Sequence, residues 1–204
     1  KKTEISPPNY LSMEGIKLLL AQPDTTSWKG RRHLALLSLM YDTGARVQEI
    51  ADLTVDCVRI DTTPYTIRLT GKGRKTRIVP LAEAQVDILR SYMEENNLND
   101  PNMIKKPLFF NGRHEKLTRE GITYILKIYA DMANKQQPEI IPKKISCHSI
   151  RHSKAMHLLQ AGVNLVYIRD ILGHVSIQTT DVYARADSKA KREALENAYT
   201  RLTP

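Results

Sequence analysis

The chain has 204 residues, which is enough for one well-packed domain or two small ones. Its 31 lysine and arginine residues against 22 aspartate and glutamate residues give a formal net charge of +9. This excess favours a polyanionic partner over a merely soluble basic surface. The two cysteines, Cys57 and Cys147, provide neither a disulfide framework nor a metal-ligand cluster, and no signal peptide or membrane-spanning apolar stretch is present. We therefore expect a protein of the reducing cytoplasm with no membrane partner.

Apolar spacing, N-cap residues and turn signals predict a mainly helical chain. The expected helices cover residues 12–22, 34–41, 46–53, 83–95, 118–133, 148–160 and 164–173, with Ser12, Thr118 and Asn164 as N-caps, and a further short helix begins at Ser176. A hairpin is expected within residues 56–80, a short strand at 108–110 and a surface loop at 136–144. The fold class is therefore α+β, mainly α-helical with a small antiparallel β-sheet or hairpin.

The third expected helix begins with a charged pair. Arg46 and Glu49 are three residues apart and share one helix face. The carboxylate can orient the guanidinium or its neighbours by hydrogen bonding. The alternative is a surface ion pair, which contributes little to stability.

The hairpin has a basic, glycine-rich tip. Ile67 and Leu69 alternate with polar residues, and the run from Gly71 to Thr76 then forms a turn before the outgoing strand begins at Ile78. A lysine on such a tip can donate a proton to a departing oxygen, whereas an arginine holds its proton too firmly to serve as an acid. Spacing alone leaves Lys72 and Lys75 as equal candidates for this role.

Polar motifs are concentrated near the C-terminus. His148 and Arg151 are three residues apart on one helix and can meet a single ligand, and the planar guanidinium matches the non-bridging oxygens of a phosphodiester. His174 directly follows a helix-ending glycine, and Tyr183 lies two helical turns beyond Ser176. With nine tyrosines in the chain, no single one would be identified as a nucleophile without this context.

No linker-like stretch divides the interior, so we expect one domain over residues 9–187 behind a leader at 1–8. Residues 188–204 form a predicted amphipathic tail, with Ala190, Leu195 and Ala198 at near-helical spacing. Amphipathicity alone does not decide whether this tail packs on its own domain or docks on a neighbouring subunit.

The order and spacing of these motifs resemble the tyrosine recombinases, the phage integrase family. The C-terminal motifs are His-x-x-Arg-His at 148–152, Leu-Gly-His at 172–174 and Ser-x-x-Thr-Thr-x-x-Tyr at 176–183. Upstream, Thr-Gly-Ala-Arg-Val-Gln-Glu-Ile at 43–50 and the basic hairpin at 71–81 match the first half of the family pattern. The resemblance runs from about residue 10 to about residue 185. Gln48, Lys154 and Met156 depart from the usual residues, but none of them occupies a catalytic position.

The resemblance implies the tyrosine recombinase catalytic-domain fold and a metal-free transesterification with no cofactor. The implied catalytic residues are Arg46, Lys72, His148, Arg151, His174 and Tyr183, with Glu49 in support and Arg74, Lys75 and Arg77 as DNA contacts. Tyr183 would form a 3′-phosphotyrosyl link to DNA, and Lys72 would be the general acid.

The resemblance also implies partners and location. We expect double-stranded DNA as substrate, a homo-tetramer on DNA, a monomeric state for this piece alone, and a nucleoid-associated location. In the family an N-terminal DNA-binding module precedes the catalytic domain, and residues 1–8 would be the linker from it. Two alternatives stay open: a type IB topoisomerase-like enzyme, and a basic DNA-binding module that has no catalytic activity.

Overall fold

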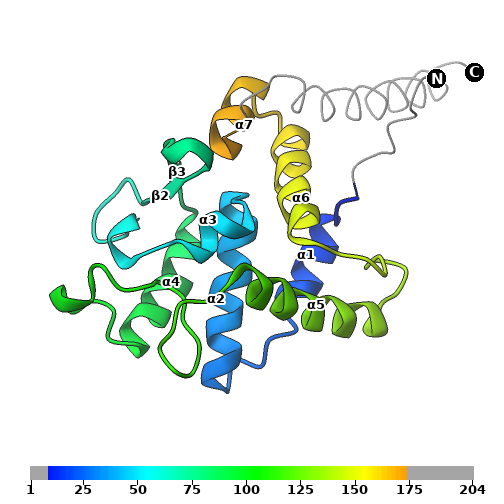
Figure 1. Cartoon of the computed structure of the whole chain (residues 1–204). Coiled ribbons are helices and arrows are strands. Elements are labelled where there is room, and N and C mark those ends of the chain that lie inside the picture. The colour runs from blue at the N-terminus through cyan, green and yellow to red at the C-terminus, as the bar shows by residue number, and fades with distance from the viewer. Residues whose placement is uncertain (1–8, 174–204) are drawn as a thin grey trace, which may run out of the picture.

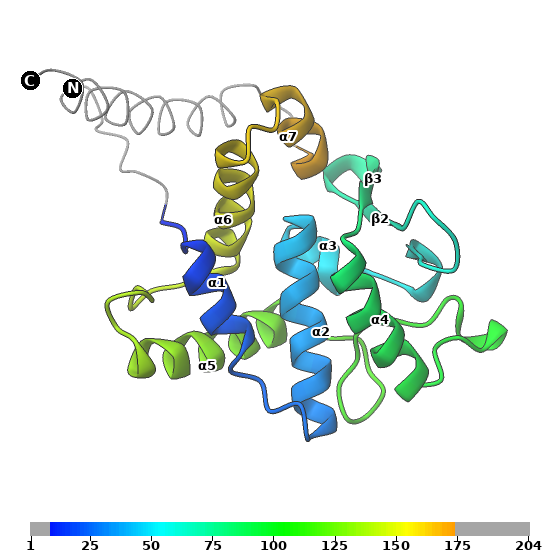
Figure 2. The same cartoon turned by 180° about the vertical axis from the view of Figure 1, so that it is seen from behind.

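A computed structural model describes residues 9–173, and over these residues helices pack around a central helix beside a small sheet (Figure 1). The α-helices are α1 (Met13–Leu20), α2 (Trp28–Thr43), α3 (Val47–Ala51), α4 (Glu83–Glu95), α5 (Arg119–Gln136), α6 (Cys147–Gln160) and α7 (Leu165–Leu172). The strands are β1 (Val58–Arg59), β2 (Thr66–Thr70) and β3 (Thr76–Pro80). Helix α2 packs against both α4 and α6, and α5 packs against α1 and α3 (Figures 1 and 2). The predicted α+β class is confirmed.

Side-chain caps begin most of the longer helices. Ser12, Ser27, Thr118 and Asn164 each accept a hydrogen bond from a backbone N–H in the first turn that follows. The caps predicted at Ser12, Thr118 and Asn164 are thus confirmed. Where the apolar face of a helix extends to its ends, hydrophobic spacing predicts those ends to within a few residues.

Helix α2 is longer than predicted, because its first turns bury polar residues that an apolar pattern does not include. Arg32 is 6% exposed and its side chain donates to the Phe110 carbonyl at 2.7 Å, and the buried His33 ring lies with Nδ1 2.8 Å from the Tyr129 hydroxyl. Hydrogen bonding makes the burial of such groups acceptable. The segment before residue 34 is therefore core helix despite its polar sequence.

The predicted hairpin is confirmed and is extended by one short strand. The sheet is antiparallel in the order β1-β2-β3, and Leu69 pairs with Arg77 while Ile67 pairs with Val79. Ile67, Leu69 and Val79 are buried on the same face of the sheet. Arg77 pairs with Leu69 and lies on the same inward face, so its side chain lies beneath the hairpin.

The strand predicted at residues 108–110 does not form. Leu108, Phe109 and Phe110 are at most 4% exposed, but within this run only Phe110 forms an isolated bridge, with Lys116, and the bridge of the preceding Pro107 joins a different segment at Thr54. The apolar run reflects burial in the core rather than membership of a sheet, and periodicity alone does not separate the two.

Helix α7 is held by a small hydrophobic cluster of its own. Ile168 and Leu172 pack with Ala155, Met156 and Leu159 of α6, apart from the main core around α2. Figure 2 shows α7 between the end of α6 and the hairpin. None of the helices within residues 9–173 is long and apolar enough to cross a membrane.

Candidate active site

Two helix C-termini meet at the site. Helix α2 ends at Gly44 and α7 ends at Gly173, and both glycines have left-handed backbone angles, with φ of 58° and 66°. A Cβ on Gly44 would lie 2.5 Å from Leu172 Cδ2, so only glycine allows α7 to approach this closely. The last carbonyls of a helix lack intrahelical partners and carry partial negative charge. Two such ends together form a site suited to cations.

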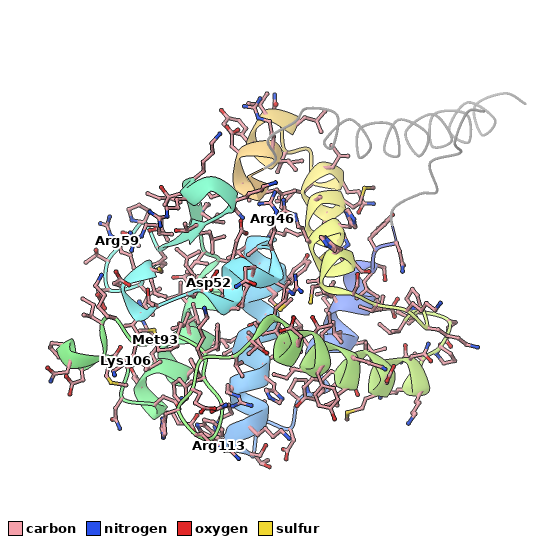
Figure 3. All side chains as sticks on the ribbon, viewed as in Figure 1. Arg46, Asp52, Arg59, Met93, Lys106 and Arg113 are labelled. Atoms are coloured by element: carbon pink, nitrogen blue, oxygen red, sulfur yellow. The ribbon has the colours of Figure 1, made fainter. Side chains whose placement is uncertain are left out.

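Three arginines from three different elements occupy this site. Each donates to one of three successive carbonyl oxygens at the end of α7. The pairs are Arg77 Nε with Ile171 O at 2.7 Å, Arg151 Nη2 with Leu172 O at 2.6 Å, and Arg46 Nη2 with Gly173 O at 3.0 Å. Figure 3 shows Arg46 where α3, α6 and α7 approach one another. We call Arg46, Arg77, Arg151 and Glu49 the arginine cluster.

Arg151 also joins the two helix ends directly. Its Nη1 donates to the Gly44 carbonyl at 2.6 Å, while its Nη2 binds the end of α7. The Arg151 residue is 5% exposed, whereas the Arg46 side chain is 37% exposed. Arg46 is therefore the more solvent-accessible of these two cations.

Glu49 is the buried carboxylate of the cluster. It accepts hydrogen bonds from the Arg46 backbone N–H at 2.8 Å, from Arg46 Nη1 at 3.0 Å, and from Arg77 Nη1 and Nη2 at 2.7 Å each. Burial raises the pKa of Glu49, but the hydrogen bonds from Arg77 and Arg46 and their charges outweigh it, so the pKa lies below its ordinary value of 4.5. Three guanidinium groups against one carboxylate leave the cluster with two excess positive charges.

The basic turn of the hairpin starts beside this cluster. A Cβ on Gly71 would lie 3.0 Å from Glu49 Oε1 and 3.7 Å from Arg46 Nη1. Lys72 follows immediately, and Lys72, Arg74 and Lys75 are all exposed. The base of the turn thus lies against Glu49 and Arg46, while its cations face solvent.

Helix α6 carries His148 as well as Arg151 of the predicted site. Ser146 caps the helix by accepting from the Ser149 N–H, and His148 is exposed in the first turn, three residues before Arg151. The His148 and His152 rings lie 6.4 Å apart. Burial, together with the charges of His148 and Arg151, lowers the pKa of His152, so His152 is neutral at neutral pH.

The structure therefore brings together Arg46, Glu49 and Arg151, which sequence reasoning selected. It also places the start of the Lys72 turn next to them. His174 directly follows Gly173 in the chain, but His174 and Tyr183 both lie outside the described residues.

Arg77 has a different environment from the one expected. The family resemblance implies that Arg77 contacts DNA, and in the structure its side chain is 13% exposed and its guanidinium binds Glu49 and the Ile171 carbonyl. Arg77 and Val79 lie on the inward face of the strand while the apolar Ile78 is 69% exposed, so the alternation of apolar and polar residues in the sequence does not predict which of these side chains is buried. Sequence reasoning also missed the close approaches at Gly44 and Gly71, which no spacing pattern encodes.

Cys147 directly precedes His148, but its thiol is not suited to act as a nucleophile. Cys147 is buried at the start of α6, and burial raises the pKa of its thiol above its ordinary value of 9.0, although the hydrogen bond with Thr123 lowers it in part. Within residues 9–173, no group of three or more histidine, cysteine, aspartate or glutamate side chains could hold a metal ion.

Comparison with known proteins identifies the family of this chain. Residues 9–190 match the phage integrase family. The chain is 36% identical over 187 residues to the integrase/recombinase y4rC of Sinorhizobium fredii, covering 92% of this chain and 55% of the relative. It is 35% identical over 207 residues to tyrosine recombinase XerD of Staphylococcus epidermidis, covering all of this chain and 65% of the relative.

Solved structures give the same result. The XerA recombinase superposes with a TM-score of 0.76 at 28% identity, covering 98% of this chain and 66% of that one. The XerH site-specific recombinase, solved bound to its palindromic difH substrate after cleavage, has a TM-score of 0.76 at 25% identity, covering 93% and 53%. The chain thus spans about half to two thirds of the length of these relatives. The chain belongs to the phage integrase family, and its described part has the fold of a tyrosine recombinase catalytic domain.

Proposed function

We propose that this chain is the catalytic domain of a site-specific DNA recombinase or integrase, which cuts and rejoins strands through a 3′-phosphotyrosyl intermediate on Tyr183. One observation carries the proposal: Arg46 and Arg151 donate to adjacent carbonyls at the end of α7, directly before His174. Two arginines held side by side with an excess of positive charge are suited to the oxygens of a phosphodiester. The difH-bound state of the similar XerH recombinase supports double-stranded DNA as the partner.

In the proposed reaction the Tyr183 oxygen attacks the phosphorus in line. A bond forms between this oxygen and phosphorus, the bond from phosphorus to the 5′ oxygen breaks, and the nucleotide 3′ to the break leaves with a 5′ hydroxyl. Arg46 and Arg151 bind the non-bridging oxygens, and His174 donates a further hydrogen bond to the charge that develops there. Attack by a 5′ hydroxyl from a second strand reverses the step without an external energy source.

Two protons must move in this step. His148, exposed one turn before Arg151, would accept the proton of the Tyr183 hydroxyl. Lys72 would give a proton to the departing 5′ oxygen, as the resemblance to the family implies. No metal cofactor is required, because the arginines, histidines and lysine supply the charge stabilisation and the proton transfers.

The assembly on DNA is part of the proposal. Strand exchange between two duplexes requires four copies of the active site, so we infer a homo-tetramer on DNA, with this piece monomeric in its absence. Arg74 and Lys75, exposed on the hairpin tip, would contact phosphates. Residues 188–204, which lie outside the part of the chain that the structure describes, would form the contact between subunits.

A covalent-capture experiment tests the reaction without knowledge of the target site. The protein is incubated in EDTA with a pool of nicked duplexes of randomised sequence, and protein-linked strands are isolated under denaturing conditions and sequenced. Peptide mass spectrometry then identifies the linked residue. We expect a nucleotide adduct on Tyr183 and a free 5′ hydroxyl on the other strand end.

Matched tyrosine variants control this experiment. Tyr183→Phe should abolish the adduct while DNA binding is retained, since one hydroxyl is lost. Tyr167→Phe alters a tyrosine that is 66% exposed on α7 and should leave the adduct unchanged. Failure to form an adduct on DNA that the protein demonstrably binds would refute the proposal in favour of a non-catalytic binding module. Relaxation of supercoils by single subunits, without strand exchange, would favour the topoisomerase-like alternative.

A further inference from the structure

Strand β3 has an inverted polarity. Ile78, an apolar residue, is 69% exposed, while its neighbour Arg77 faces inward with 13% of its side chain exposed. An inward charge beside an outward isoleucine contradicts the pattern expected of a half-buried strand. Such an exception points to a role for Arg77 beyond the folding of the sheet.

The contacts of Arg77 link the hairpin to two other parts of the site. Its two terminal nitrogens each donate to one Glu49 oxygen at 2.7 Å, a bidentate pairing, and its Nε donates to the Ile171 carbonyl at 2.7 Å. Glu49 in turn holds both the backbone N–H and the Nη1 of Arg46. Arg77 therefore contacts the residue that orients Arg46 and the helix end that leads to His174.

The same contacts also determine how much positive charge remains on Arg46. Glu49 bonded to Arg46 alone would neutralise that guanidinium. With Arg77 as its bidentate partner, Glu49 is matched by one arginine, and the positive charge of the other remains uncompensated. Because these groups are buried or half-buried, solvent screens them less than it screens surface charges.

We propose that Arg77 is a positioning residue for the strand-transfer reaction. It fixes Glu49 so that Glu49 orients Arg46 without neutralising the site, and it holds the Ile171 carbonyl in register with the other two arginines. The inference rests on the proposed function, but it makes Arg77 act through Arg46 and not by contact with DNA.

Two substitutions at Arg77 test this role in a single-turnover assay of adduct formation. Arg77→Met removes the charge, and Arg77→Lys keeps the charge but loses the planar fork. Misplacement of a catalytic group by about 1 Å costs about 100-fold in rate, so we expect losses of this order for both variants, with affinity for uncleaved DNA near that of the unaltered protein. Arg59→Met, on the exposed side of the same sheet, is the matched control and should react at the unaltered rate.

A double-mutant cycle separates positioning from a general structural role. If Arg77 acts through Arg46, then Arg77→Lys should cost little more once Arg46→Lys is present, because the orientation that it maintains has already been lost. Independent, multiplicative losses in the double variant would overturn the proposal. So would an unaltered rate in Arg77→Lys, whose fold is checked by thermal unfolding.

Failure of the further inference is distinguishable from failure of the proposed function. If the unaltered protein forms no Tyr183 adduct, the reaction itself is wrong and Arg77 has nothing to position. If the unaltered protein reacts and folded Arg77→Lys reacts equally fast, only the role of Arg77 is refuted. A loss of DNA affinity that matches the loss of rate would instead restore Arg77 as a DNA contact.

Discussion

Replacement of Gly44 by alanine should weaken the junction of the two helix ends. At φ of 58°, alanine costs roughly 1 to 2 kcal/mol in the left-handed region, and this is partly offset by about 0.4 to 1 kcal/mol because the unfolded chain is less flexible. The new Cβ would also lie 2.5 Å from Leu172 Cδ2, and overpacking of this kind costs about 1 to 3 kcal/mol. We therefore expect Gly44→Ala to lower the free energy of unfolding by about 2 to 4 kcal/mol.

A second glycine separates the two contributions. Gly162 has a φ of 83°, and a Cβ there would meet nothing within 4 Å, so Gly162→Ala changes only the backbone preference. Urea unfolding of both variants, with equal slopes, would give their stabilities directly. Gly44→Ala should be the less stable by at least about 1 kcal/mol, as the overpacking estimate requires. Equal losses in the two variants would mean that α7 does not depend on the close approach at Gly44.

Three further predictions concern buried ionisable groups and a helix cap. Burial, with a smaller effect of nearby positive charges, lowers the pKa of His33 from 6.5 to about 4. The free energy of unfolding should therefore fall as the pH drops from 6.5 towards 4. His33→Gln should remove this fall, as measured by urea unfolding across that range. The pKa of Glu49 is also lowered, so its contribution to stability is present above pH 4.5 and is lost as the pH falls through its pKa in the folded protein. Glu49→Gln should therefore show a shallower loss of stability in acid than the unaltered protein. Equal losses of stability in acid would contradict the ion pairs of Glu49. Ser146→Ala should cost about 1 kcal/mol of unfolding free energy, and an unchanged denaturation midpoint would exclude a stabilising cap at α6.

The sequence predicts the helices and the hairpin well where apolar spacing and capping residues agree. Residues 83–95 were expected to be helical, and α4 has those bounds. The capping residue of α5 was likewise identified in advance at Thr118. These features depend on interactions within about one helical turn, which a single sequence contains in full.

Features that depend on contacts distant in sequence were not predictable in the same way. The polar start of α2 is helical because Arg32 and His33 find partners at Phe110 and Tyr129, about 80 to 100 residues away. The apolar run at 108–110 was expected to be a strand, yet it fills the core between two separate segments. In both cases tertiary packing overrides the local pattern.

The candidate site was likewise predictable only in part. The order of the motifs selected Arg46, Glu49 and Arg151, and the structure places them together, although nothing in their spacing indicates that carbonyl oxygens would hold the arginines. The basic composition of the turn predicts that Arg77 contacts DNA together with Arg74 and Lys75. Alternation along β3 does not decide its position, because Ile78 and Val79 are both apolar and lie on opposite faces, and only the pairing with β2 places Arg77 inside the protein.

The use of carbonyl oxygens to hold arginines explains how a buried site can keep an affinity for anions. A carboxylate beside each guanidinium would orient it equally well, but it would also cancel the charge that a phosphate needs. Helix C-termini offer strong acceptors with only partial negative charge, so Arg46 and Arg151 are oriented with most of their charge retained. The single carboxylate, Glu49, is shared with Arg77, and the cluster keeps its positive excess. Because the same three carbonyls lie directly before residue 174, any displacement of α7 would disturb the orientation of both arginines and the position of His174 together.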